Sequence, residues 1–379
     1  MPTRYDVFAE VIEKGPCKAK DLPFTVDIYN HLRALVVMGW VKESNKQYLP
    51  VKNNKTIHAF RIIKYCLKNG LDYNMFFSKN ALPIVKALFA SAPSLRPIKG
   101  NRDALEFLQY LEDNQFMLTA KKRPREGIVL RHQLFEDLHL LHGEKPNLKT
   151  TNYVHPFDDV KKIRETTNPF DESIFDYISG SASLEGSTIT PGETRELILN
   201  DIYPDKPQKD IQMVKNLNEA LQYVFEHLNE EITEADIKEL NRIIMFSLHR
   251  HAGKYKITQN KIQGNPNFKT ASPKSVPPLM EGYVKYLNEI QFREECLKEL
   301  GRIHNEIQAI HPFADGNSRT TRMVVNWMLM KHEFPVLVIK MGCFDEYMSL
   351  SKLAKDRSDE HLGVLLQRLM LHESLLRRG

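Results

Sequence analysis

Apolar residues recur at helical spacing along most of this chain of 379 residues. In the second half, amphipathic runs of this kind predict helices at about 172–184, 209–228, 234–248, 278–288, 292–310, 319–332, 345–355 and 361–376. Residues 254–274 depart from this pattern, because apolar and polar positions alternate around Gly264, Asn265 and Pro266. That alternation predicts a β-hairpin on an otherwise helical domain. The fold class expected is mainly α.

The first 52 residues predict a small domain of their own. Three helical segments, near 5–15, 18–23 and 25–39, are followed by a hairpin from Trp40 to Val51. Helix, helix, helix and hairpin is the order of a winged helix. Some winged helices bind DNA and others only dock proteins, so both functions stay open here.

Residues 53–145 predict a second helical region, with one hairpin at 116–130. Residues 146–159 are polar and show no helical period, which is typical of a linker. A third domain, mainly helical, is expected over 160–379.

Composition narrows the class of protein. The sequence is 42% hydrophobic and 27% charged, and its apolar runs are much shorter than a membrane span, so we expect no contact with a membrane. Four widely spaced cysteines indicate neither a zinc site nor a disulfide framework. Acidic residues interrupt the first apolar stretch, which does not fit a signal peptide and favours the cytoplasm.

Charge is distributed unevenly along the chain. Residues 1–150 contain 24 Lys and Arg against 15 Asp and Glu, which gives +9, and residues 151–379 contain 29 against 33, which gives −4. A basic first half is compatible with a nucleic-acid partner, but solvated lysines on helix faces give the same count. A DNA-binding regulator is therefore the alternative class of function.

The segment 311–322, HPFADGNSRTTR, carries the candidate chemistry. Pro312 disfavours helical geometry at His311, so the preceding helix should end there. We expect Phe313 to be buried as a plug, and Asp315 and Gly316 to form a tight turn. Asn317 or Ser318 can then cap a new helix.

A helix N-terminus favours a phosphate, since it offers backbone N–H groups and the positive end of the helix dipole. Arg319 and Arg322 are three residues apart on the new helix, so both can contact the phosphates of one nucleotide. Asp315 is a suitable oxygen ligand for Mg²⁺, and Mg·ATP is the ligand expected. His311 can then act as the general base for an attacking hydroxyl. The residues alone leave open which phosphorus is attacked.

This segment resembles the Fic family signature H-x-F-x-[D/E]-G-N-x-R-x-x-R, which it matches at every fixed position. The resemblance implies transfer of AMP from ATP to a Ser, Thr or Tyr hydroxyl of a target protein, with His311 as the base and Asp315 as the magnesium ligand. It implies that Gly316, Asn317 and Ser318 contribute to an anion site, with a serine where glycine is often found. The outer phosphates would contact the two arginines, and the hairpin at 254–274 would be a flap that aligns the target. Removal of AMP and other nucleotide donors also occur in the family.

A second motif lies upstream, where Ser181, Glu185 and Gly186 fit the inhibitory pattern [S/T]-x-x-x-E-[G/N] of the family. The resemblance implies that Glu185, near the end of a helix at about 172–186, pairs with Arg322 and blocks productive ATP binding. The ordinary alternative is a surface carboxylate near a helix end. The partners expected are a target protein, DNA in the alternative function, and a second copy of the chain.

Other chemically active residues have plainer interpretations. His249 and His251 stand at a predicted helix end, where capping is the favoured role. His304 is interpreted as a packing residue. Tyr347 is either a core residue or a contact for the adenine ring.

Overall fold

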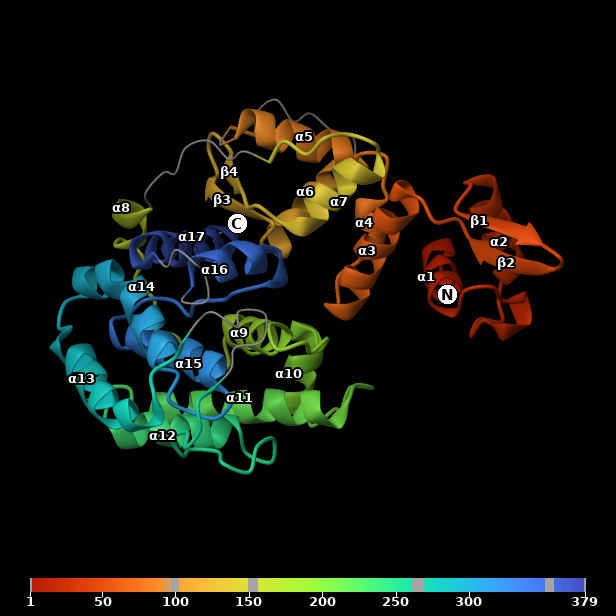
Figure 1. Cartoon of the computed structure of the whole chain (residues 1–379). Helices are drawn as coiled ribbons and strands as arrows, with labels where there is room; N and C mark the ends of the chain where they lie inside the picture. The colour runs from red at the N-terminus through yellow and green to blue at the C-terminus, as the bar shows by residue number, and fades with distance from the viewer. Residues whose placement is uncertain are drawn as a thin grey trace. The chain divides into compact units, whose positions relative to one another are not determined.

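A computed structural model describes residues 2–92, 94–95, 102–148, 156–260, 269–351 and 358–377. The chain divides into two compact units, 1–91 with 98–110 and 131–149, and 92–97 with 111–130 and 150–379. Helices dominate both units (Figure 1), so the mainly α prediction is confirmed. None of the helices in the described parts has the length and apolar character needed to cross a membrane.

The first unit begins with the elements in the order predicted from the sequence. Its elements are α1 (Arg4–Lys14), η1 (Ala19–Asp21), α2 (Ile28–Val37), β1 (Val41–Ser44), β2 (Gln47–Pro50), α3 (Asn54–Lys68), α4 (Tyr73–Phe76), α5 (Ala81–Ser91), α6 (Arg102–Asp113), whose last three residues group with the second unit, and α7 (Gln133–Leu141). β1 and β2 pair antiparallel, with Val41 opposite Pro50. Classification of residues 1–52 as a winged helix stays a prediction.

The second unit contains the remaining elements. They are β3 (Met117–Lys121), β4 (Glu126–Val129), α8 (Phe157–Val160), α9 (Glu172–Ser183), α10 (Pro191–Asn200), α11 (Gln208–Glu226), α12 (Glu234–Ile244), η2 (Pro273–Ser275), α13 (Val276–Glu289), α14 (Arg293–Ile310), α15 (Asn317–Lys331), η3 (Met341–Cys343), α16 (Phe344–Leu350) and α17 (Asp359–Arg377).

The hairpin β3–β4 differs in grouping from the sequence prediction, which assigned it to a middle region at 53–145. It forms as expected, with Met117 opposite Val129, but it groups with the second unit. The cause is hydrogen bonding to α17: the Thr119 backbone N–H donates to His372 Nδ1 over 2.9 Å, and Gln115 donates to Glu373 over 2.9 Å. In the predicted linker at 146–159, residues 149–155 lie outside the described residues, and α8 begins at Phe157.

α15 lies at the centre of the second unit. Every residue of this helix from Arg319 to Met330 is buried, and α14 packs against both α15 and α17 (Figure 1). α11 and α12 pack against α15 as well. A helix buried on all sides is held in one position, so it can fix side chains at its N-terminus precisely enough for chemistry.

Residues 254–274, predicted as a hairpin, are described only in part. The predicted turn at Gly264, Asn265 and Pro266 lies outside the described residues. In the described parts, Tyr255 forms one antiparallel bridge with Phe313. Tyr255 therefore lies against the loop between α14 and α15.

Candidate active site

The loop between α14 and α15 begins at His311, where α14 ends as predicted. The His311 backbone N–H still donates to the Ile307 carbonyl over 2.9 Å, but its φ of 51° and ψ of 60° are left-handed. Pro312 follows, and its ring disfavours a helical conformation at the preceding residue. This turn holds a partly exposed His311 at the end of a buried helix.

Phe313 anchors the loop in the core, as expected, with 1% of its surface exposed. Its backbone N–H donates to Asn317 Oδ1, and its carbonyl accepts from Asn317 Nδ2, both over 2.9 Å. The expectation that Asn317 or Ser318 caps the new helix is wrong. Gly316 is the N-cap, and α15 begins at Asn317, because the Asn317 amide is used to close the loop on Phe313.

Gly316 has a φ of 76°, a conformation that favours glycine. A β-carbon at this position would lie 2.6 Å from both Cγ and Sδ of Met245. The backbone of the turn is thus in contact with the residue that follows α12, and no side chain fits between them.

We expect Gly316→Ala to lower the free energy of unfolding by about 1–3 kcal/mol, because it adds both overpacking and backbone strain. Thermal unfolding measures the change. Gly192→Ala in α10 is the matched control, since a β-carbon there meets nothing within 4 Å, and this variant should be as stable as the wild type or more so. Equal stability of the two variants would contradict this description of the turn.

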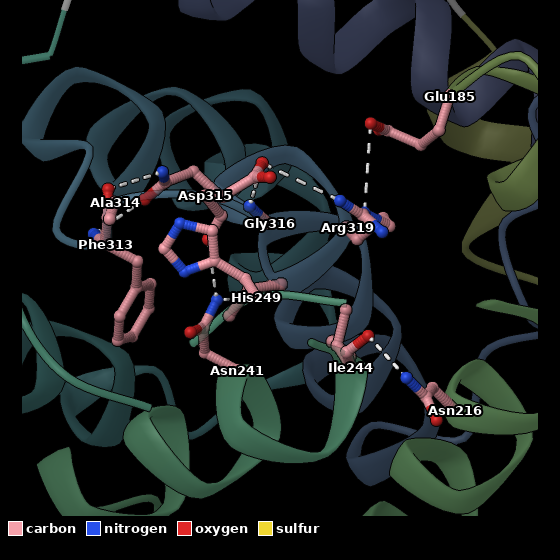
Figure 2. Close-up of polar contacts among 12 residues, drawn as sticks. Glu185, Asn216, Asn241, Ile244, His249, Phe313, Ala314, Asp315, Gly316 and Arg319 are labelled. Atoms are coloured by element: carbon pink, nitrogen blue, oxygen red, sulfur yellow. Dashed lines mark hydrogen bonds and ion pairs between the residues drawn. The ribbon is translucent and has the colours of Figure 1, made fainter. Parts of the chain in front are cut away.

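Asn241 on α12 fixes the same turn, and sequence reasoning missed it. Its Nδ2 donates to the Asp315 carbonyl over 3.1 Å (Figure 2), and its Oδ1 accepts from the Gly253 backbone N–H over 2.9 Å. Asn216 in turn donates to the carbonyls of Ile244 and Phe246. A signal was available, because an amide at 241 interrupts the apolar face of the predicted helix 234–248.

α12 ends at Ile244 rather than near 248, so His249 and His251 lie in the turns beyond the helix. The interpretation of these two histidines as helix caps is wrong. His249 Nδ1 accepts from the backbone N–H of His251 over 3.2 Å.

Asp315 is the acidic residue of the loop, and 56% of its side chain is accessible to solvent. Its Oδ1 accepts from the Gly316 backbone N–H over 2.6 Å and lies 3.7 Å from Arg319 Nη2 (Figure 2). The carboxylate therefore stands at the entrance of α15, where a helix leaves its first backbone N–H groups without intrahelical acceptors.

Arg319 and Arg322 are buried, with 6% and 4% of their surfaces exposed, and both approach Glu185. Arg322 Nη2 donates to Glu185 Oε1 over 2.9 Å, and Arg319 Nε lies 3.8 Å from Glu185 Oε2 (Figure 2 shows the contact with Arg319). Arg319 Nε has no hydrogen-bond partner in the described part of the chain. A buried guanidinium donor without an acceptor is costly, so this nitrogen is available for a ligand.

Arg322 also contacts Ser181, near the end of α9. Arg322 Nε donates to Ser181 Oγ, and Nη2 donates to the Ser181 carbonyl, both over 3.0 Å. Glu185 follows the helix, and Gly186 has a φ of 95°. Ser181 and Glu185 thus contact the same guanidinium group, although Glu185 lies just beyond the helical residues.

The charges of this cluster affect one another. Burial raises the pKa of Glu185, but the positive charges of Arg322 and Arg319 outweigh burial, so its pKa lies below the usual value. For Arg322, burial lowers the pKa and the Glu185 charge raises it, with a net rise. At neutral pH, Glu185 is therefore ionised and forms an ion pair with Arg322.

Tyr347 and His304 are both buried, and the Tyr347 hydroxyl lies 2.6 Å from His304 Nε2. Burial raises the pKa of Tyr347 to about 12. This pairing favours a core role for both residues, as interpreted for His304.

Residues 231–329 match the model of the Fic/DOC family, and the chain contains a domain of this family. The family interpretation of the sequence is thus confirmed. Protein adenylyltransferase Fic of Nematostella vectensis is 32% identical over 191 residues, which cover 46% of this chain and 42% of the relative. Protein adenylyltransferase fic-1 of Caenorhabditis elegans is 27% identical over 183 residues, covering 46% and 35%. This chain matches less than half the length of these two relatives.

A solved structure, residues 134–508 of Fic-1 from C. elegans, aligns with 94% of this chain and 92% of that one, at 18% identity and a TM-score of 0.48.

Proposed function

We propose that this chain is a protein adenylyltransferase that moves AMP from ATP to a Ser, Thr or Tyr hydroxyl of a target protein, and that Glu185 restrains it. The name shared by the relatives supports the AMP donor and the protein acceptor. The observation that carries the proposal is the approach of Arg319 and Arg322 to one carboxylate at the entrance of α15, next to the His311 loop.

ATP would take the place of that carboxylate. The two arginines bind its outer phosphates, with Arg319 Nε supplying a buried donor. The first turn of α15, which contains Asn317 and Ser318 after Gly316, supplies backbone N–H groups for the phosphate next to the ribose. A site of fixed donors in a buried setting stabilises the charge that develops during transfer.

His311 removes the proton of the attacking hydroxyl. A bond forms between the hydroxyl oxygen and the α-phosphorus, the bond from the α-phosphorus to the bridging oxygen breaks, and pyrophosphate leaves with that electron pair. The proton remains on His311 until solvent takes it. Positioning and charge neutralisation supply the rest of the acceleration.

Asp315 would hold Mg²⁺. The described residues contain no group of three or more His, Cys, Asp or Glu side chains that could bind a metal by themselves. One exposed carboxylate beside a phosphate site nevertheless fits this ion, which prefers one or two carboxylates, water and substrate phosphates. When bound, Mg²⁺ would neutralise charge on the phosphates.

We expect Asp315→Asn to weaken magnesium-dependent ATP binding about tenfold, which corresponds to about 1.4 kcal/mol. Calorimetric titration of Mg·ATP into the Glu185→Gly background measures it. Asp201→Asn is the control, because that exposed carboxylate follows α10. The same affinity in both variants would exclude Asp315 as the metal ligand.

Ser181, Glu185 and Gly186 form the inhibitory element. Ser181 holds Arg322 in place through its hydroxyl and carbonyl, Glu185 neutralises it, and the positive φ of Gly186 turns the chain away from the helix. Because the carboxylate is an internal competitor for the phosphate position, inhibition ends when Glu185 is displaced. The same arrangement is compatible with AMP removal.

Three further assignments stay predictions: a cytoplasmic location, a homodimer and DNA binding by residues 1–52. A DNA-binding regulator is not favoured, since the relatives carry the name of an enzyme.

Peptide mapping tests the proposed function. The Glu185→Gly chain is incubated with Mg·ATP and a mixture of proteins, and tandem mass spectrometry locates AMP on Ser, Thr or Tyr. AMP on such side chains, above the level given by wild type, is the expected result. Peptides that carry phosphate alone would contradict the proposal.

A further inference from the structure

Lys256 is a buried lysine in the segment between α12 and η2, with 4% of its surface exposed. Its Nζ donates to Thr270 Oγ1 over 3.0 Å and to the Ile310 carbonyl over 3.2 Å. Its backbone N–H donates to the Pro312 carbonyl over 2.8 Å. One residue thus contacts the backbone on both sides of His311.

These contacts matter because His311 is in the left-handed region, which is unfavourable for a residue with a β-carbon. Such a conformation persists only where the surroundings fix it. The two carbonyls that flank His311 belong to Ile310 and Pro312, and both accept from Lys256. Lys256 therefore supports the backbone on both sides of His311.

Thr270, which accepts from Lys256, is itself bonded to Gln259. Gln259 Nε2 donates to the Thr270 hydroxyl over 2.7 Å and to the Thr270 carbonyl over 3.0 Å. The Ala271 backbone N–H donates to the Ala309 carbonyl over 3.4 Å. Residues 256–259 and 270–271 are thereby tied to each other and to the end of α14.

Burying a lysine to make these contacts costs solvation free energy. Burial lowers the pKa of Lys256 to about 8, and within the described ranges no carboxylate forms an ion pair with it. Loss of solvation without an opposite charge is unfavourable, so the Nζ contacts must offset part of that cost. A contact that served stability alone could use a neutral donor. The chain instead places the amino group of Lys256 against Ile310, the residue that precedes the proposed base.

We propose that Lys256 is a positioning residue for the transfer reaction, which orients His311 by fixing the carbonyls of Ile310 and Pro312. This inference rests on the proposed function. It assigns to Lys256, in the segment after α12, a role in fixing the conformation of the loop that begins at His311.

The test uses the full chain with Glu185→Gly and compares Lys256→Met, Lys256→Arg and the control Lys285→Met, which alters an exposed lysine on α13, outside the segment 254–274. Lys256→Met should lower kcat about 10- to 100-fold and leave KM for ATP within about twofold, as expected when an interaction acts in the transition state. Lys256→Arg should recover part of kcat, because a guanidinium can still donate to the Thr270 hydroxyl and the Ile310 carbonyl, and Lys285→Met should change nothing.

A spectroscopic readout separates this inference from the proposed function. In ¹⁵N-histidine-labelled protein, the His311 resonance, assigned with His311→Ala, should shift in Lys256→Met while ATP affinity by calorimetry stays within about twofold. This result is informative even if the parent chain transfers no AMP. Thr270→Val, which removes one acceptor, should give a smaller shift of the same resonance. An unchanged His311 resonance, or equal losses of ATP binding and kcat with a lower Tm, would overturn the inference.

Discussion

His311→Ala should lower AMP transfer by about 10²- to 10⁴-fold, the range typical of losing a general base. ATP affinity should stay within about twofold, because the phosphate contacts come from Arg319, Arg322 and the start of α15, and the substitution leaves these unchanged. Label incorporation into protein measures the transfer, and calorimetry measures ATP binding, both in the Glu185→Gly background.

His361→Ala is the matched control, since this histidine is exposed at the start of α17. It should keep full activity. Undiminished transfer by the His311→Ala chain would remove His311 from the role of base. Loss of ATP binding in the same variant would mean that the alanine disturbs the anion site as a whole.

Glu185→Gly should raise AMP transfer at least about tenfold, because it removes the carboxylate that occupies Arg322 at 2.9 Å. Removing the carboxylate leaves the buried Arg322 guanidinium without its opposite charge, which is unfavourable. The variant should therefore have a lower Tm than wild type without nucleotide. Mg·ATP should raise its Tm by more than it raises that of wild type, since phosphate replaces the lost charge.

Glu185→Gln separates charge from shape, and we expect intermediate activation. The pKa of Glu185 is lowered in the folded state, and this sets the sign of the pH effect. The ion pair stabilises the fold fully above the ordinary carboxyl pKa. This stabilisation is lost as the pH falls through the lower pKa of the folded state. Inhibition should accordingly persist throughout the neutral range. Equal transfer rates for wild type and Glu185→Gly from pH 6 to 8 would contradict the inhibitory role.

The backbone of the His311 loop could be predicted where local chemistry decides it. Pro312 ends α14 by its own geometry, and an aromatic residue in a polar loop, Phe313, has only the core to pack into. The hairpins at 41–50 and 117–129 also form from local alternation. The approach of Glu185 to Arg322 was expected from resemblance, since no spacing argument joins residues so far apart in the chain.

Helix ends were less predictable, for identifiable reasons. α10 was missed, although Thr190 and Glu193 form a capping box around Pro191, a direct signal for a helix start. α12 stops at Ile244 because the distant Asn216 donates to two carbonyls at its end. The prediction that Asn317 caps α15 was wrong because its side-chain amide forms hydrogen bonds with the backbone of Phe313 across the loop.

The residues that support the site were the least predictable. Asn241 and Lys256 donate hydrogen bonds to the backbone carbonyls of Asp315 and Ile310, which are more than fifty residues away in sequence. Such contacts follow from tertiary packing and leave no motif. The sequence predicted the side chains of the candidate site, and the structure adds residues that contact the backbone around them.

Parallel incubations of Glu185→Gly with α-labelled and γ-labelled ATP test the central claim most directly. We predict that protein retains label from the α position only, because pyrophosphate leaves with the outer two phosphates, and that His311→Ala in the same background lowers this label by about 10²- to 10⁴-fold. Protein that retains the γ-label and not the α-label would contradict AMP transfer.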